Sequence, residues 1–449
     1  MVRAAALASA MVLVGVCGGQ GKTAAQVGAG VSYVKAGHLF DSVAGRYRDG
    51  VVLVVEGERI RSVEGAGFAI PAGAKVVDLS ADYVLPGLID CHTHLGARAD
   101  KYDPINSFLE TPFTTAFNGV RNAKTTLDAG FTTVRDVGSA PFLAVDLRNA
   151  INAGEVVGPR VVASGPILSI TGGHGDLNNY SPEVTVTMYP EHRDFSIADG
   201  PEQVRQTIRE QVKYGVDVIK ISASGGVLSK GDQPGAPQYT LEELKMAAET
   251  AHQAGRKIAA HAHGAVSIKW AIEAGIDSIE HASLVDDEGI RLAKQHGTYF
   301  VMDIYNDDYI LGKAKDFGIP EEMLVKERGV GKLQRENFRK AWKAGVKMAF
   351  GTDAGVYPHG DNAKQFHYMV MLGMTPAQAI QAATSAAADL IGRAADVGVL
   401  SAGHYADLLA VKEDPLGRVE VLEHVGLVMK GGAVVKDELT GKEGAVSRE

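Results

Sequence analysis

Cysteine and tryptophan are the scarcest residues in this chain, with two of each among 449 residues. The cysteines are Cys17 and Cys91, and removal of an N-terminal leader would leave Cys91 alone. No intramolecular disulfide is then available to the mature protein, even in an oxidising compartment. The fold must depend on its apolar core, and a chain of this length with 45% hydrophobic residues can bury a large one.

The chain also lacks an excess of positive charge. It has 45 lysines and arginines against 54 aspartates and glutamates, which gives a formal net charge of -9. Nucleic acids and anionic membranes favour basic surfaces, so neither is expected as the main partner. A small-molecule substrate is expected instead.

An apolar run at the N-terminus is too short to span a bilayer, which needs roughly 20 apolar residues. Arg3 precedes this run, which extends through Val16, and small and polar residues follow from Gly18 to Gln26. This is the layout of an export signal. We predict a signal peptide over residues 1–26 and a periplasmic or secreted mature protein, with a disordered leader or a misassigned start as the alternatives.

A repeated phrase of helix, glycine and short apolar strand fills the middle of the chain. The glycine is expected to end each helix in a left-handed cap, and the apolar run after it to form a buried parallel strand. The copies are LDAG-FTTVRD (127–136), VKYG-VDVIKI (212–221), HQAG-RKIAAHAH (252–263), IEAG-IDSIEH (272–281), KQHG-TYFVMDI (295–304) and WKAG-VKMAFGTD (342–353). VLPGLIDCHTH (84–94) and RVVASGPIL (160–168) bring the expected strands to eight.

Eight parallel strands separated by helices or long loops are what a (β/α)8 TIM-like barrel requires, and we predict this α/β fold for residues 86–399. A doubly wound open sheet is the alternative. It is disfavoured because no glycine-rich phosphate-binding fingerprint follows the first strand, and because polar residues follow many strands rather than one crevice.

Short β-prone runs and turns characterise both flanks of this region. We predict that residues 27–85 and 400–437 together form one small β-sandwich, followed by a tail over residues 438–449. Separate N- and C-terminal domains are the alternative.

Histidines gather where three of the expected strands end. His92 and His94 are two residues apart on one strand, so both imidazoles can face the same ion. His261 and His263 share a strand face in the same way, and His281 ends the next strand. We expect His261 to be the ligand and His263 to lie nearer solvent, although periodicity alone does not choose between them.

Lys220 lies in the apolar run Val218-Ile219-Lys220-Ile221, where burial of an ammonium group is costly. Its amine can either extend to solvent or, with its pKa lowered by burial, react with carbon dioxide to form a carbamate that bridges two cations. Asp353 follows the last expected strand, between Gly351 and Gly355, where glycine lets the backbone approach a ligand closely. These placements put the candidate residues at the face where barrels carry function.

In their order, these motifs resemble the signature set of the amidohydrolase superfamily over about residues 32–437. The motifs are Pro86-Gly87-Leu88-Ile89-Asp90-Cys91-His92-Thr93-His94, Lys220, His261-Ala262-His263-Gly264, Ile279-Glu280-His281, Gly351-Thr352-Asp353-Ala354-Gly355 and Gly403-His404-Tyr405-Ala406-Asp407-Leu408-Leu409. The chain is most similar to the imidazolonepropionase-like branch, which includes bacterial Xaa-Pro dipeptidases and ochratoxin-degrading amidohydrolases. Imidazolonepropionase itself has a glutamate in place of His263 and one metal without the lysine, which argues against that activity.

The resemblance implies two divalent metal ions, with zinc the expected metal and manganese or cobalt also suited to the ligands. It assigns His92, His94 and Asp353 to the more buried ion, His261 and His281 to the more exposed one, and carbamylated Lys220 to both. Asp353 would move a proton from water to the leaving nitrogen. His174, in the loop Thr171-Gly172-Gly173-His174-Gly175, and His263 would stabilise the oxyanion or hold the substrate.

The expected reaction is cleavage of the amide bond in a small substrate with a free carboxylate, such as an N-acyl amino acid, an Xaa-Pro-type dipeptide or ochratoxin A. Candidate carboxylate contacts are His174, Lys269 and His359. A lactonase or cyclic-amide hydrolase using the same metal site is the alternative. A non-catalytic metal-binding module would lack one of the ligands, and none is missing. The resemblance also implies a homo-oligomer, often an octamer in relatives.

Overall fold

The structure is a computed structural model that describes residues 30–99, 105, 109–178, 180–188 and 195–441. The predicted signal peptide, residues 1–26, lies outside these ranges. Within them, none of the helices combines the length and the apolar character needed to cross a membrane.

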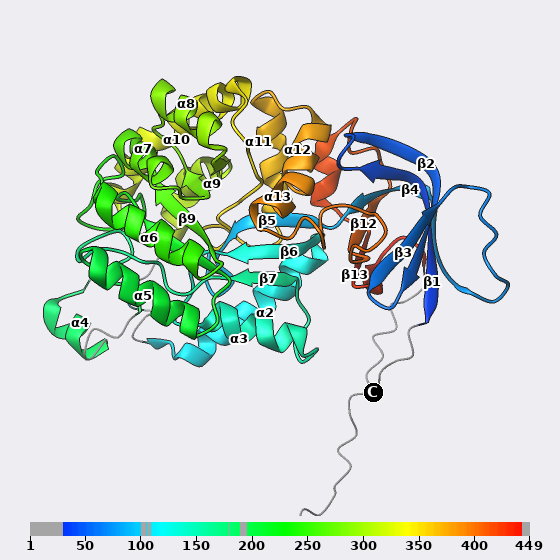
Figure 1. The fold of residues 1–449 in the computed structure, drawn as a ribbon, viewed down its shortest axis with the longest axis horizontal. Helices are drawn as coiled ribbons and strands as arrows, with labels where there is room; N and C mark the ends of the chain where they lie inside the picture. Colours follow the sequence, from blue (N-terminus) through cyan, green and yellow to red (C-terminus); the bar gives the residue numbers. More distant parts are fainter. Residues whose placement is uncertain (1–29, 100–104, 106–108, 179, 189–194, 442–449) are drawn as a thin grey trace, which may run out of the picture.

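One seven-stranded sheet contains strands from both ends of the chain, in the order β14-β13-β12-β4-β1-β2-β3 (Figure 1). Its strands are β1 (Val31–Asp41), β2 (Arg46–Glu56), β3 (Arg59–Glu64), β4 (Lys75–Pro86), β12 (Leu408–Val411), β13 (Leu427–Lys430) and β14 (Ala433–Asp437). The antiparallel pairs Leu408–Pro86 and Val411–Tyr83 join the two ends directly. The strand that enters the central region of the chain is thereby held against the strand that leaves it.

Two parallel sheets fill the central region, with strand orders β5-β6-β7 and β11-β10-β9-β8. Their strands are β5 (Leu88–Thr93), β6 (Phe131–Asp136), β7 (Arg160–Ala163), β8 (Val218–Ser222), β9 (Lys257–Ala262), β10 (Ser278–His281) and β11 (Tyr299–Val301). Every residue of β5, β6 and β8 is buried, as in parallel strands that are covered on both faces. The predicted α/β class is confirmed.

Isolated parallel bridges join the edge strands β8 and β11 to segments outside the two sheets. Leu168, beyond β7, pairs with Ile221, and Phe300 of β11 pairs with Met348. The last expected strand, within 342–353, is not a regular strand, although a bridge between Ala354 and Thr93 returns the chain to β5. One cause is local, because Asp353 has φ of 59° and leaves the extended conformation.

Helices lie around the two parallel sheets, with α4 at the edge of the molecule (Figure 1). They are α2 (Pro112–Asp128), α3 (Leu143–Asn152), α4 (Pro182–Met188), α5 (Pro201–Lys213), α6 (Leu241–Gln253), α7 (Ala265–Glu273), α8 (Asp287–His296), α9 (Asn306–Phe317), α10 (Glu321–Ala344), α11 (Gln365–Met371), α12 (Pro376–Ala382) and α13 (Ser385–Leu390). The glycines of the six repeated phrases all have positive φ, between 67° and 93°. The predicted left-handed conformation at these helix ends is confirmed.

Candidate active site

All eight residues named from the sequence as catalytic or metal-binding line one cavity of about 210 Å³. They are His92, His94, His174, Lys220, His261, His263, His281 and Asp353. Six of them stand in or directly after β5, β8, β9 and β10, so the carboxyl ends of neighbouring parallel strands position them together. This is the face at which α/β barrels bind their substrates.

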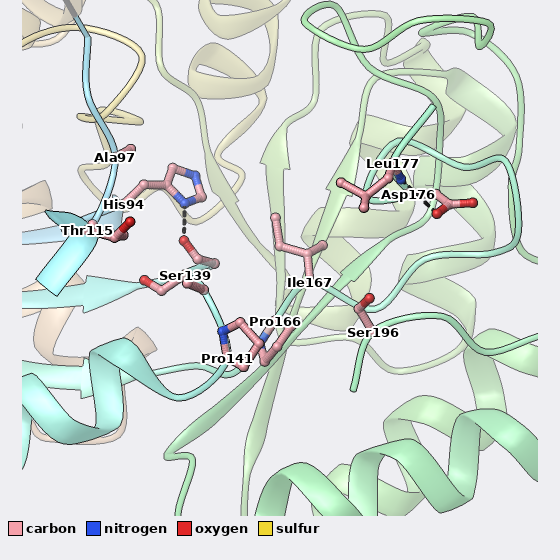
Figure 2. Close-up of a pocket in the computed structure, with 14 residues that line it drawn as sticks. His94, Ala97, Thr115, Ser139, Pro141, Pro166, Ile167, Asp176, Leu177 and Ser196 are labelled. Carbon is pink, nitrogen blue, oxygen red and sulfur yellow. Dashed lines mark hydrogen bonds between the residues drawn. The ribbon is translucent and has the colours of Figure 1, made fainter. Parts of the chain in front are cut away.

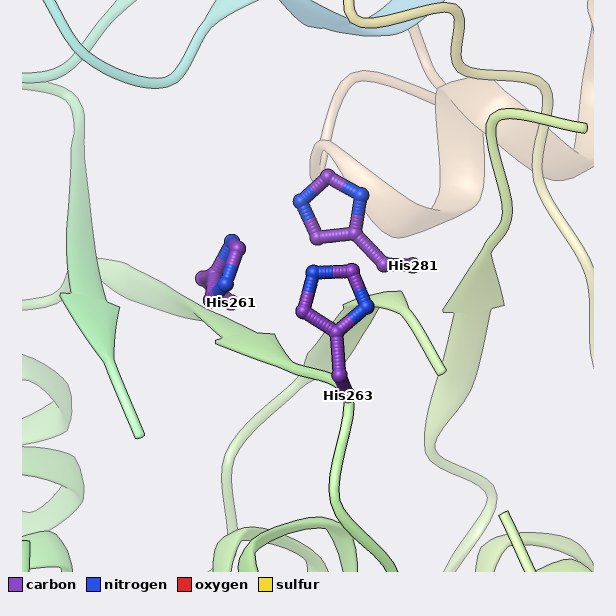
Figure 3. Close-up of side chains that lie close together, drawn as sticks. All are labelled: His261, His263 and His281. Atoms are coloured by element: carbon purple, nitrogen blue, oxygen red, sulfur yellow. The ribbon is translucent and has the colours of Figure 1, made fainter. Parts of the chain in front are cut away.

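Three histidines converge on one side of the cavity (Figure 3). Ligand nitrogens of His261, His263 and His281 all lie within 4.8 Å of one another. The rings of His263 and His281 are stacked with centroids 4.8 Å apart, and the ring of His261 stands 4.5 Å from that of His281. Both His261 and His263 are thus placed to bind an ion beside His281.

His92, His94 and Asp353 form a second group with ligand atoms within 4.8 Å. Asp353 Oδ1 lies 3.0 Å from His94 Nε2 and 3.4 Å from His92 Nε2. Lys220 adjoins this group, with Nζ 3.5 Å from His92 Nε2. Burial lowers the pKa of Lys220 to about 8, against the opposing effect of the Glu280 and Asp353 carboxylates.

Contacts on the far side of three imidazole rings fix which nitrogen carries the proton. His94 Nδ1 donates to the Gly138 carbonyl at 2.7 Å, and His261 Nε2 donates to the Gly225 carbonyl at 3.3 Å. A carbonyl oxygen only accepts, so the other nitrogen of each neutral ring has a lone pair. His281 Nδ1 is held by the Asp303 carboxylate at 2.8 Å. Such contacts orient histidines that bind metals.

Strained backbone accompanies two of the candidate ligands. His281 and Asp353 have φ of 70° and 59°, in the left-handed region that residues with a side chain rarely adopt. The glycines that flank Asp353 are also required sterically. A Cβ on Gly351 would lie 3.0 Å from the Cβ of His92, and one on Gly355 would lie 2.8 Å from the Cβ of His94. At both glycines the backbone therefore packs closely against the two histidines.

Glu280 and Arg135 were not identified from the sequence. Both are buried, and Arg135 Nη2 donates to Glu280 Oε1 at 2.8 Å. Glu280 Oε2 lies 3.0 Å from His92 Nδ1, so this pair is packed directly against the ring. Like Lys220, Arg135 is a charged residue inside a buried strand. The same pattern in the sequence could therefore have identified it.

Asp303 is a second residue that sequence reasoning missed. Besides His281, it accepts hydrogen bonds from Asn306 Nδ2 at 2.6 Å and Gln334 Nε2 at 2.9 Å. Burial raises the pKa of Asp303, but the neighbouring His281 and other groups outweigh burial and lower the pKa to about 2. Its position just after β11, at the same face as the other site residues, was the available signal.

His174 enters the cavity from a loop and stacks on His261, with ring centroids 4.2 Å apart. Its Nδ1 lies 2.8 Å from Ser229 Oγ, and Ser229 Oγ donates to Asp232 Oδ1 at 2.7 Å. Because the hydroxyl has one proton and Asp232 receives it, Ser229 accepts from His174 Nδ1. Burial lowers the pKa of His174 to about 4. The neutral ring therefore has its lone pair on Nε2.

Lys269 and His359, the other candidate carboxylate contacts, are not among the residues that line the cavity. Lys269 Nζ is paired with Asp286 at 2.9 Å and Glu288 at 3.0 Å. His359 is buried behind the site, where its Nε2 lies 3.2 Å from the carbonyl of His94. Sequence position placed both near the strand ends but could not reveal these partners.

A neighbouring pocket of about 370 Å³ shares His94, Ala97 and Ile167 with this cavity of candidate ligands. Figure 2 shows His94 at one side of this pocket, with Pro141, Pro166 and Leu177 among its other lining residues. The pocket therefore adjoins the cavity that holds the candidate metal ligands.

The sequence matches the Amidohydrolase family over residues 83–435, which is most of the chain. The chain therefore belongs to the amidohydrolase family and is a hydrolase of amide bonds.

Individual relatives and solved structures within this family are also similar to the chain. Ochratoxinase of Aspergillus niger is 36% identical over 380 residues, which cover 81% of this chain and 78% of the relative. The crystal structure of a Xaa-Pro dipeptidase with bound methionine superposes with a TM-score of 0.85 and 38% identity, covering 90% of this chain and all of the other. A prolidase complexed with N-methylphosphonate-L-proline gives a TM-score of 0.83 and 30% identity, covering 91% of this chain and all of that one.

Proposed function

We propose that this chain is a binuclear metal-dependent amidohydrolase that cleaves small dipeptide-like or N-acyl amino acid substrates with a free carboxylate. The observation that carries the proposal is the meeting of six potential ligands at one cavity. Similarity to a Xaa-Pro dipeptidase and to ochratoxinase supports this substrate class and extends it to ochratoxin A.

The donor set fits divalent cations. Imidazole nitrogens and carboxylate oxygens are zinc ligands, and three groups of them have ligand atoms within 4.8 Å of one another, the third being His281, Asp303 and Asp353. Lone pairs crowded in this way repel one another unless a cation lies between them. We assign His92, His94 and Asp353 to one ion, His261 and His281 to the other, and Lys220, as a carbamate, to both. His263 lies close enough to join the second ion or to contact the substrate.

When bound, the two ions would acidify a water molecule and polarise the scissile carbonyl. Asp353 would accept the proton of the attacking water and return it to the leaving nitrogen. Its Oδ2 accepts a hydrogen bond from Asn306 Nδ2 at 3.1 Å, which orients the carboxylate. His174, neutral and with a lone pair on Nε2, would accept a hydrogen bond from the substrate, whereas donation to an oxyanion would require a protonated ring.

The architecture and cellular setting are proposed in the same way. The bridges Leu168–Ile221, Phe300–Met348 and Thr93–Ala354 support closure of residues 86–399 into a (β/α)8 barrel. Residues 27–85 and 400–437 would form the β-sandwich around the seven-stranded sheet that both ends share. The sequence layout of residues 1–26 supports export. The family resemblance supports a homo-oligomer, which could be an octamer.

A matched substrate panel tests this function. Xaa-Pro dipeptides, N-acyl amino acids and lactones would be assayed with the zinc-loaded enzyme, and each acid would be paired with its methyl ester. We expect the free-acid amides to have the highest kcat/KM. Equal values for acids and esters would contradict carboxylate recognition, and preference for lactones over every amide would establish the lactonase alternative.

A further inference from the structure

One face of helix α10 forms part of the cavity wall and includes the acidic residue Glu327. Glu327, Val330 and Gln334 of α10 all line the cavity, and their spacing of three and four residues places them on one face of the helix. Gln334 reaches Asp303, which holds His281. Glu327 lies two turns from Gln334, so it stands at the same cavity but away from the candidate metal ligands.

Glu327 is buried, with 5% of its surface exposed. Among the residues that the structure describes, no lysine, arginine or histidine nitrogen lies within 4.0 Å of its carboxylate. Another acid, Asp307, lies close enough to raise its pKa. The neighbouring cations are used elsewhere: Lys326 Nζ binds Asp232 at 2.7 Å, and Arg335 binds Asp308 at 3.0 Å and stands 3.6 Å from Asp307.

This arrangement makes the negative charge of Glu327 costly in the absence of a ligand. A carboxylate removed from water needs a cation or several hydrogen-bond donors to offset the lost hydration. Burial, followed by the charges of Asp307 and Asp303, raises the pKa of Glu327 to about 8. A cationic group that entered the cavity would stabilise the ionised carboxylate and be bound in return.

We propose that Glu327 binds a positively charged amino group of the substrate, so that dipeptides with a free amine are bound in preference to N-acylated amino acids. The proposal rests on the proposed function for the identity of the cavity as the substrate site. A metal ion is a poorer occupant of this position, because the described side chains that cluster tightly enough for metal binding do not include Glu327. An ammonium ion needs only a few hydrogen-bond acceptors and carries its own proton donors.

Binding of two ligands that differ only in an amine tests this role without requiring turnover. The ligands are L-methionine and 4-(methylthio)butanoate, which keep the same carboxylate and thioether. Titration calorimetry with the zinc-loaded enzyme should show methionine binding roughly 10- to 100-fold more tightly, the scale of a charge-assisted hydrogen bond. In Glu327→Gln this preference should fall to a few-fold at most, with the affinity for 4-(methylthio)butanoate unchanged.

Glu322→Gln is the matched control, since it removes an exposed acid from the same helix and should preserve the preference. Equal binding of the two ligands by the wild-type enzyme would overturn the proposal, as would an undiminished preference in folded Glu327→Gln. Because the wild-type comparison does not need the variant, it tests whether the amine strengthens binding even if Glu327→Gln folds poorly. Failure to hydrolyse dipeptides, with the amine preference intact, would instead refute the proposed function and leave the role of Glu327 standing.

Discussion

Lys220 Nζ lies 3.5 Å from Nε2 of His92, and each of the two residues is only 1% exposed. An ammonium group at this position would be cut off from water and could donate only a long hydrogen bond to the lone pair of His92 Nε2. A carbamate on Lys220 would reverse the sign of the charge and supply oxygen ligands. The proposed carbamate is the form of Lys220 in which the two residues of this contact would bind one metal ion together.

Lys220→Ala should lose activity and about one equivalent of bound metal, because it removes the proposed bridging ligand. Short carboxylic acids such as acetate or propionate should restore part of both, by occupying the space of the carbamate. Metal analysis and turnover measured with and without added acid provide the readout. Full metal content together with wild-type turnover in the variant would contradict a bridging role.

Asp353→Asn should reduce kcat by a factor of about 100 or more, the scale expected when general acid–base catalysis is lost. The amide preserves the shape of the side chain but cannot shuttle the proton. Steady-state kinetics on variant protein with measured metal content would separate this effect from loss of a ligand. If kcat were unchanged at normal metal content, another group must move the proton.

Gly226→Ala should displace His174, since a Cβ on Gly226 would lie 2.2 Å from Nδ1 and Cε1 of its ring. A shift of the ring would cost roughly tenfold or more in kcat/KM, because catalysis depends on how the substrate is positioned. Gly235→Ala is the control in the same loop, where the added Cβ would approach nothing closer than Leu284 Cδ1 at 3.9 Å. Equal kinetics for the two variants would show that the position of His174 does not matter.

The raised pKa of Glu327 predicts a pH dependence of stability. With a folded-state pKa of about 8 and an ordinary glutamate pKa of 4.5, the folded protein retains a proton that the unfolded chain has lost between these two pH values. The contribution of Glu327 to stability is therefore fully present below about pH 4.5 and is lost as the pH rises towards 8, by up to about 1.4 kcal/mol per unit. Glu327→Gln removes this loss.

Urea unfolding of the wild type and Glu327→Gln at several pH values between 5 and 9 would measure the effect. The free energy of unfolding of the variant relative to the wild type should rise across this range and level off above pH 8. Parallel pH profiles for the two proteins would show that Glu327 titrates normally.

Sequence reasoning located the cavity residues because strand periodicity and strand order determine which side chains meet at the carboxyl ends of parallel strands. It located Lys220 because burial of a charged group inside an apolar strand costs free energy, which indicates a functional role. It did not locate the Arg135–Glu280 pair, whose members are 145 residues apart and meet only in the folded protein. It also misplaced Lys269, because an ion pair with Asp286 depends on side-chain direction rather than on position along the chain.

The last expected strand shows which backbone feature the sequence pattern could not predict. The apolar run that leads to Gly351 resembles the other strands, but Asp353 adopts φ of 59° and the segment pairs with its neighbours only through isolated bridges. Hydrophobic periodicity predicts which residues are buried, but it does not predict a local change of backbone conformation such as this one. The same departure positions Asp353 against His92 and His94.

Anomalous X-ray diffraction from a crystal of the zinc-loaded enzyme, recorded on both sides of the zinc absorption edge, tests the central claim most directly. Two peaks about 3.5–4 Å apart are predicted in the cavity, the spacing typical of two-metal sites. Additional electron density should extend from Lys220 Nζ and reach both peaks. A single peak, or an unmodified Lys220 side chain beside two ions that it does not contact, would contradict the binuclear, carbamate-bridged site.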